Sequence, residues 1–143
     1  MVTASGDRGE SWNRPGVVVG SSQVDTGARR VMTVGVNSSG VVGVLVAERS
    51  VKSGARCLRL DFSASFDGGT TFGTPQPVSS SWCGNSPPDE IAARMFPTYG
   101  DYFGIVSTPD ARFRVMWPEM RDGRSVLLTT IVAVDGRATA PAK

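Results

Sequence analysis

The chain has 143 residues, of which 40% are hydrophobic and 20% charged, and its formal net charge is +2. These values predict a single folded domain or a piece of one, and no apolar run approaches the ~20 residues that a membrane helix needs. The sequence has no histidine, which excludes a Ser-His-Asp triad and removes the usual zinc ligand. We expect no metal and no cofactor. The basic residues are scattered along the sequence, which argues against a nucleic-acid partner.

Short strands make up most of the predicted structure. The first set is a predicted meander of strands at 31–36, 41–48 and 58–65, and the second set is predicted at 102–107, 113–117 and 125–134. These segments are rich in β-branched or alternating apolar residues, and glycine-, serine- and proline-rich turns separate them. The only predicted helical turn is 89–96, between prolines. The pattern therefore predicts an all-β, antiparallel fold in which one meander occurs twice.

Two octapeptides share one pattern. Residues 5–12 (SGDRGESW, the first octapeptide) and 65–72 (SFDGGTTF, the second octapeptide) both read S-x-D-x-G-x-x-[W/F], and a proline follows each of them three residues later. Glycine permits a positive φ, the Asp and Ser side chains bond to the exposed backbone of the turn, and the aromatic residue covers the apolar layer beneath. The motif therefore predicts a locked turn. The matching positions are Ser5, Asp7, Gly9 and Trp12 in the first octapeptide and Ser65, Asp67, Gly69 and Phe72 in the second.

A second repeat joins the strand patterns. Residues 40–49 align with 112–121, and this alignment places Asp135 where Asp67 lies in the earlier copy. The sequence therefore predicts the start of a third, degenerate octapeptide after the last strand.

The octapeptides resemble the Asp-box, or BNR repeat, of the sialidase-like β-propellers. Residues 100–105 (GDYFGI) and 117–123 (WPEMRDG) are also similar to strand starts and strand ends of bacterial secreted members. The resemblance implies antiparallel four-stranded propeller blades: residues 14–20 as the fourth strand of a split blade, 31–80 as a complete blade, and 102–134 as three strands of the next blade. Such a segment needs the remaining propeller blades or self-association, because open strand edges are left exposed.

The family binds its ligands on the face opposite the Asp-boxes. In this chain that face would collect 21–30, 49–55, 81–101 and 119–124, whereas both octapeptides and the turns at 37–40 and 109–111 would lie on the other face. The resemblance therefore assigns Asp7 and Asp67 to turn stabilisation. Arg49 and Arg121, each expected at the end of a second strand, are candidates to bind a substrate carboxylate; the alternative is pairing with the neighbouring Glu48 or Asp122.

Catalytic candidates come from the same face. Glycoside hydrolysis needs carboxylates, and the loop candidates are Asp25, Asp89 and Glu90. Glu119 with Tyr102 or Tyr99 would form the tyrosine-carboxylate pair of sialidases; the alternative for Tyr102 is packing between blades. Trp82 is the candidate for stacking on a sugar ring.

The two cysteines, Cys57 and Cys83, fit neither a CxxC pair nor a zinc site, which leaves one bridge or two buried thiols. The predicted hairpin near residues 69–70 brings them together. Because members of the resembling family are extracellular, we expect a disulfide. Residues 1–7 show no signal peptide.

The function implied by the resemblance is that of an extracellular carbohydrate-active protein, an exo-α-sialidase-like glycoside hydrolase, of which this chain is a fragment without a complete catalytic set. The alternative is a non-catalytic propeller scaffold that binds a glycan or a protein. A glycan or glycoconjugate is the expected ligand in the first case.

Overall fold

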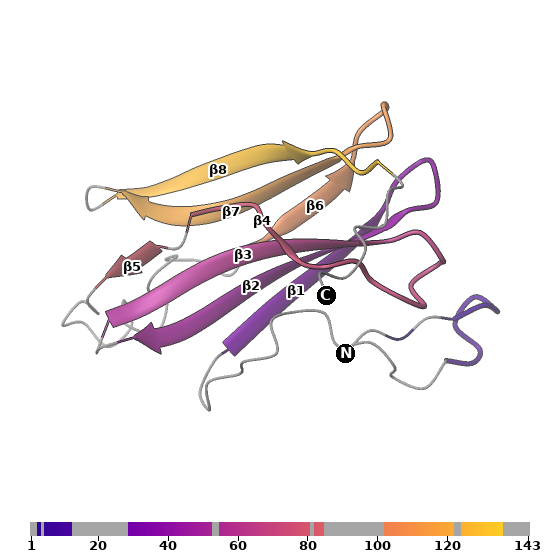
Figure 1. The fold of residues 1–143 in the computed structure, drawn as a ribbon, viewed down its shortest axis with the longest axis horizontal. Coiled ribbons are helices and arrows are strands. Elements are labelled where there is room, and N and C mark those ends of the chain that lie inside the picture. Colours follow the sequence, from indigo (N-terminus) through magenta and orange to yellow (C-terminus); the bar gives the residue numbers. More distant parts are fainter. Residues whose placement is uncertain are drawn as a thin grey trace, which may run out of the picture.

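A computed structural model describes residues 3, 5–12, 29–52, 55–80, 82–84, 102–121 and 124–135. Two antiparallel sheets form this part of the chain, and no helix occurs in it (Figure 1). The first sheet has the order β1-β2-β3-β4 with β5 also beside β3, and the second has the order β6-β7-β8. The strands are β1 (Arg29–Val36), β2 (Val42–Lys52), β3 (Ala55–Ser65), β4 (Gln76–Pro77), β5 (Trp82–Gly84), β6 (Gly104–Ser107), β7 (Phe113–Arg121) and β8 (Arg124–Val132). The predicted all-β, antiparallel class is confirmed. The strand predicted at 14–20 and the helical turn predicted at 89–96 lie outside the described residues.

The fourth strand of the first sheet is interrupted and runs past residue 80, where the blade predicted at 31–80 was expected to end. β4 pairs with β3 at Phe62 and Asp61, and β5 pairs with it again at residues 56–58. Pro77 has no backbone N–H to donate to a ladder, so a regular strand is difficult to continue there. The Val78 N–H still donates to the Leu60 carbonyl at 3.0 Å, and the strand resumes only at Trp82. The first meander therefore extends to residue 84.

The core lies between the two sheets. Along β3, the side chains of Leu58, Leu60 and Phe62 are buried against the second sheet, whereas the intervening residues point to the other face of the first sheet. This follows from the two-residue period of a strand. Across the interface the rings of Phe62 and Phe113 lie 5.4 Å apart at 50°. We call the two facing surfaces the inner faces and the two opposite surfaces the outer faces.

Gly43 allows the sheets to approach. A Cβ atom at this position would lie 2.9 Å from the ring of Phe62 and 3.0 Å from the ring of Phe113. Real Cβ atoms do not come this close to ring atoms without displacing them. The glycine in β2 is therefore required by packing and not by backbone conformation.

The first two strands of each sheet are joined by equivalent turns. In the β1–β2 turn, the Asn37 N–H donates to the Val41 carbonyl at 3.0 Å and Gly40 has φ of 79°; in the β6–β7 turn, the Thr108 N–H donates to the Arg112 carbonyl at 2.9 Å and Ala111 has φ of 59°. Gly40 is therefore equivalent to Ala111. The sequence alignment, which placed Gly40 on Arg112, is wrong by one position. The sequence pattern missed this because Ala111 adopts a left-handed conformation that normally selects glycine.

The last strand changes the interpretation of Asp135. Val132 is paired with Phe113 in the same way that Ser65 is paired with Val42. Since Asp67 lies two positions after Ser65, its equivalent is Val134 and not Asp135. The third copy of the octapeptide therefore has valine at both positions where the second octapeptide has its serine and its aspartate.

Candidate functional site

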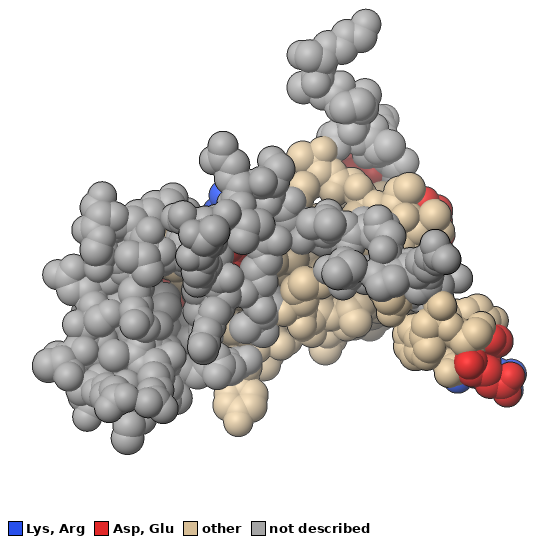
Figure 2. Space-filling view, turned by 90° about the horizontal axis from the view of Figure 1, so that it is seen from below, with Lys and Arg blue, Asp and Glu red and all other residues tan. Residues whose placement is uncertain are grey.

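The two ends of the sheets differ in composition. At one end, which we call the turn end, lie the β1–β2 and β6–β7 turns and the second octapeptide, which connects β3 to β4. The Asn37 side-chain amide donates to the Ala111 carbonyl and thereby joins the two turns. The first octapeptide lies beside the second, because both line one cavity. The predicted placement of both octapeptides and both turns on one face is confirmed. Figure 2 shows the largest visible group of acidic atoms at the right-hand extremity, on the side of the turn end.

The two octapeptides have the same hydrogen bonds. In the second, Ser65 Oγ donates to Asp67 Oδ1 at 2.7 Å and accepts from the Gly69 N–H at 2.8 Å, and Asp67 Oδ1 also accepts from the Thr71 N–H at 2.8 Å. In the first, Ser5 and Asp7 make the equivalent bonds, at 2.8, 2.7 and 2.9 Å. The residue at the seventh position of each octapeptide, Ser11 or Thr71, donates its hydroxyl to Oδ2 of the same aspartate. The carboxylate is thus used to hold its own turn.

These hydrogen bonds lower the pKa of both carboxyl groups. The Thr71 hydroxyl, then the Thr71 N–H and Ser65, bring the pKa of Asp67 from 3.8 to about 2. The Ser11 hydroxyl, then the Ser11 N–H and Ser5, bring the pKa of Asp7 to about 2. Hydrogen bonds to the charged form favour it. Both groups are therefore ionised over the whole neutral range, which suits an acceptor of turn hydrogen bonds and not a proton donor in catalysis.

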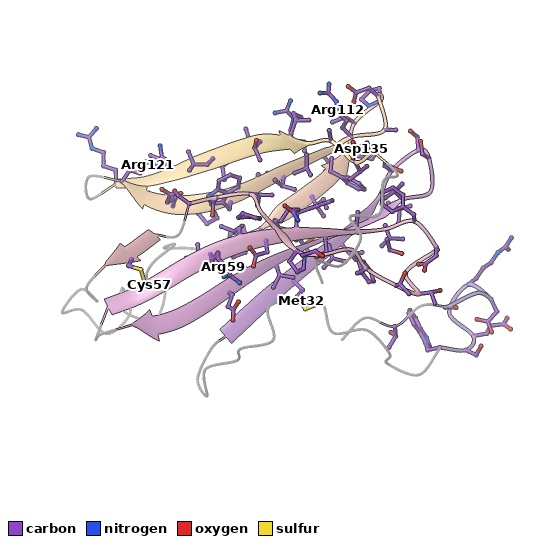
Figure 3. The ribbon with its side chains drawn as sticks, in the orientation of Figure 1. Met32, Cys57, Arg59, Arg112, Arg121 and Asp135 are labelled. Atoms are coloured by element: carbon purple, nitrogen blue, oxygen red, sulfur yellow. A yellow bond between two sulfur atoms is a disulfide. The ribbon has the colours of Figure 1, made fainter. Side chains whose placement is uncertain are left out.

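The opposite end, which we call the arginine end, is where β2 and β7 finish and β1, β3 and β8 start. Seven basic residues have backbone positions here: Arg29, Arg30, Arg49, Lys52, Arg56, Arg121 and Arg124. Arg29 is paired with Arg49 in the ladder, and Arg121 with Arg124. Although the basic residues are scattered in the sequence, antiparallel pairing collects these seven at one end. Figure 3 shows Arg121 at this end with Cys57, and Arg112 and Asp135 at the turn end.

Glu119 and Arg121 form an ion pair at the arginine end. Glu119 is 8% exposed; its Oε1 accepts from Arg121 Nε at 3.0 Å and its Oε2 accepts from Trp117 Nε1 at 3.3 Å. The Arg121 side chain is 57% exposed. Among the guanidinium nitrogens of Arg121, Nε makes the contact with Glu119 within the described residues. The alternative from the sequence was that Arg121 pairs with Asp122, which lies outside the described residues; within the described residues Arg121 pairs with Glu119 instead.

Arg49 does not lie at the end of its strand. β2 continues to Lys52, and Arg49 is paired with Leu58 within the ladder. The sequence prediction that Arg49 and Arg121 end equivalent strands is therefore wrong in this respect: with Gly40 aligned on Ala111, Arg121 is equivalent to Ser50. Both arginines still have backbone positions at the arginine end.

A second carboxylate-arginine group was missed by the sequence analysis. On the outer face of the first sheet, Arg59 contacts Asp61 Oδ2 with Nε at 2.9 Å and with Nη2 at 2.8 Å, and contacts Glu48 Oε2 at 3.4 Å. Glu48 and Asp61 are 9% and 5% exposed. Glu48 is the structural equivalent of Glu119, so each second strand carries one buried glutamate with an arginine partner. The signal was a glutamate at the same position of both repeats, which the one-position error in the alignment concealed.

Of the remaining candidates, two lie within the described residues and four lie outside them. Tyr102 is 83% exposed, so the prediction that it packs between blades is wrong, and it precedes β6 instead of starting that strand. Trp82 starts β5, at the arginine end, opposite Leu58. The other candidates lie outside the described residues: Asp25, Asp89, Glu90 and Tyr99.

Cys57 and Cys83 form a disulfide with Cα atoms 4.0 Å apart. They are directly opposite in the β3–β5 ladder. The disulfide predicted from the hairpin is confirmed, and it attaches the short β5 to the arginine end.

The described residues line two cavities at the turn end. The first, of about 640 Å³, is lined by the second octapeptide and the end of β8, including Phe66, Phe72 and Val134. The second, of about 560 Å³, lies between the first octapeptide and the outer face of the first sheet, where Trp12 and Met32 line it. Since the octapeptide carboxylates accept hydrogen bonds from their own turns and the lining is largely apolar, these cavities offer few groups to a polar ligand such as a sugar.

Among the described side chains, no group of three His, Cys, Asp or Glu residues is placed to hold a metal ion. The elements described include no helix of the length and hydropathy needed to cross a membrane. Comparison with known protein families, with curated proteins and with solved structures gives no match to this chain.

Proposed function

We propose that this chain forms two consecutive blades of a sialidase-like β-propeller and binds a glycan at the arginine end. The observation that carries the proposal is the repetition of one turn: both octapeptides fold with the same serine and aspartate hydrogen bonds. A single match to the S-x-D-x-G-x-x-[W/F] pattern would have little weight. Two matches with one geometry, beside two meanders with equivalent turns, support a repeat protein of this type.

The chemistry of the two ends supports binding at the arginine end. At the turn end, the carboxylates of Asp7 and Asp67 accept bonds from their own turns, and Arg112 is paired with Asp110. At the arginine end, Arg121 is exposed beyond its contact with Glu119. A guanidinium with open N–H groups is suited to a carboxylate ligand because its planar fork binds both oxygens. A glycan that carries a carboxylate is therefore the proposed ligand class.

Binding without hydrolysis is the form of the function that the described residues support. Each carboxylate oxygen of Glu119 accepts a hydrogen bond, from Trp117 or Arg121, and the group is nearly buried. In the part of the chain that the structure describes, Tyr102 makes no bond to Glu119. A tyrosine nucleophile needs a base within hydrogen-bond reach. The Tyr102–Glu119 pair that the resemblance implies is thus not assembled, and Tyr99 lies outside the described residues.

An extracellular setting is part of the proposal. The Cys57–Cys83 disulfide supports it, because structural disulfides persist in oxidising compartments and are rare in reducing ones.

The test uses the whole chain with 3′-sialyllactose in calorimetry and a fluorogenic sialoside in a turnover assay. We expect binding of the trisaccharide without turnover. Arg121→Ala should weaken binding about tenfold or more, since hydrogen bonds to charged groups contribute about 1.5–3 kcal/mol. Arg112→Ala, which changes an arginine of the turn end, is the matched control and should bind as the native chain does. Turnover by the native chain would contradict binding without hydrolysis, and absence of binding would contradict the glycan function.

A further inference from the structure

The larger cavity lies at the turn end of the interface between the two sheets. It has a volume of about 640 Å³, and both sheets contribute to its wall, with Phe62 from β3 and Val132 from β8. The second octapeptide adds the rings of Phe66 and Phe72. Phe62 is buried in the core, whereas Phe66 is 50% exposed. We call it the phenylalanine cavity. A concave, aromatic wall of this size is typical of a site for a small molecule.

The charged groups of this wall are all negative. Asp67 and Asp135 line the phenylalanine cavity, and the described lining includes no Lys or Arg. Hydrogen bonds from Thr71 and Ser65 lower the pKa of Asp67 to about 2, so this carboxylate keeps its charge at neutral pH while it holds its own turn. An anionic ligand therefore finds no cationic partner in the wall, whereas a cationic ligand finds two carboxylates.

Asp135 differs from the octapeptide aspartates because no turn uses its hydrogen-bonding capacity. Asp7 and Asp67 each accept a hydrogen bond from the serine two positions earlier. The residue two positions before Asp135 is Ala133, which has no hydroxyl. Within the described residues, Asp135 has neither a hydrogen bond nor an ion pair. Its carboxylate is therefore available to a ligand of the cavity.

The smaller cavity, of about 560 Å³, occupies the equivalent place in the preceding repeat. Trp12 and Gly68 line the smaller cavity, and Phe72 and Asp135 line the phenylalanine cavity. The two aromatic residues both end an octapeptide, and the pairing of the third strands places Asp135 at the position of Gly68. The described wall of the smaller cavity contains Arg8 and no carboxylate. The negative charge is thus a property of one cavity and not of the repeat.

From the shape and the charge of this cavity, we infer that it binds a small organic cation, in which an ammonium group is carried by an apolar body. The apolar body packs against the phenylalanine rings of the wall, and the ammonium group lies beside Asp135. Aromatic rings attract cations by their quadrupole, and quaternary ammonium ligands are recognised in this way. The cavity is at the end of the molecule opposite the proposed glycan site, so either proposal can fail alone.

Titration of the whole chain with benzyltrimethylammonium tests the inference. In two-dimensional amide NMR at low salt, the shifts should saturate and should be largest in residues 64–76 and 132–135. Benzyl alcohol, which keeps the aromatic ring and lacks the charge, is the control ligand and should bind about fivefold more weakly or less. Absence of saturable shifts in these residues, or equal binding of benzyl alcohol, would overturn the inference.

Two variants separate the contributions of the carboxylate and of the ring. Asp135→Asn keeps the shape of the side chain and removes its charge, and it should weaken benzyltrimethylammonium binding about two- to fivefold. Asp110→Asn removes an exposed carboxylate of the turn end that does not line the cavity, so it is the matched control and should bind as the native chain does. Phe66→Leu keeps an apolar side chain and removes the ring, and it should weaken binding to a similar extent. Native affinity in Asp135→Asn or in Phe66→Leu would overturn the inference.

Discussion

The polar residues of the turn end and of the arginine end differ in how many of their hydrogen bonds stay within their own segment. At the turn end, Ser65 and Asp67 bond to backbone and side chains of their own octapeptide. At the arginine end, Arg121 contacts Glu119 through Nε, and its side chain is 57% exposed. Polar groups whose capacity is used locally stabilise the fold, whereas groups with capacity left are available to a ligand. By this criterion the octapeptide residues are structural, and Arg121 is the proposed binding residue.

Removal of the disulfide, which lies at the arginine end, should lower the free energy of unfolding more than any other change considered. The Cys57–Cys83 bridge closes a loop with a sequence separation of 26, for which loop entropy predicts a loss of about 3 kcal/mol. The double variant Cys57→Ala/Cys83→Ala should therefore unfold at markedly lower urea concentration. The native chain with reducing agent is the control and should behave in the same way. A native chain whose urea midpoint is insensitive to reduction would show that the bridge is not a stabilising element.

Loss of one octapeptide hydroxyl should have the next largest effect. Ser65 is 1% exposed and its Oγ bonds to both Asp67 and the Gly69 N–H. Ser65→Ala leaves these groups without their partner, which costs about 1–2 kcal/mol. Ser5→Ala, at the equivalent position of the more exposed first octapeptide, should cost less, and thermal unfolding of the two variants compares them directly. Equal losses would mean that burial does not decide the strength of this turn.

Much of this architecture was readable from the sequence, because it depends on local signals. Alternation along β3 and the glycine-rich turns located the strands, and the S-x-D-x-G pattern identified both locked turns and their shared end. The side-chain group of Arg59, Glu48 and Asp61 was not readable, since it depends on the register of two strands. Neither was the alignment of the two repeats, because an alanine at position 111 adopts a backbone conformation for which the sequence gives no signal. The sequence analysis placed Arg49 at the end of its strand because the apolar run stops at Ala47, whereas β2 continues to Lys52.

Acid should destabilise the turn end before the arginine end. The pKa values of Asp7, Asp67 and Asp110 are each lowered to about 2 from 3.8. A lowered folded-state pKa means that the stabilisation is complete above pH ~4 and is lost as the pH falls towards 2. Hydrogen exchange between pH 5 and pH 2 should therefore show protection of residues 65–72 falling first. Asp67→Asn should remove most of this pH dependence in the second octapeptide; an unchanged acid response in that variant would contradict the assignment.

Removal of the exposed arginine should have the smallest effect on stability. Arg121 contacts one buried carboxylate, Glu119, through Nε, so Arg121→Ala should shift the thermal midpoint least. Arg59→Ala removes the cation shared by two buried carboxylates, Glu48 and Asp61, and should shift it more, because more buried negative charge is left without a partner. A larger loss in Arg121→Ala than in Arg59→Ala would assign Arg121 a structural role in place of a binding role.

Ligand binding at the arginine end, and not at the octapeptides, is tested most directly by hydrogen exchange. The native chain is compared with and without saturating 3′-sialyllactose, and exchange is read by mass spectrometry. We predict slower exchange in peptides that cover the end of β7 and the start of β8, residues 117–128, with no change in residues 64–75. Protection confined to residues 64–75 would contradict this placement, and would show that the octapeptides bind the ligand.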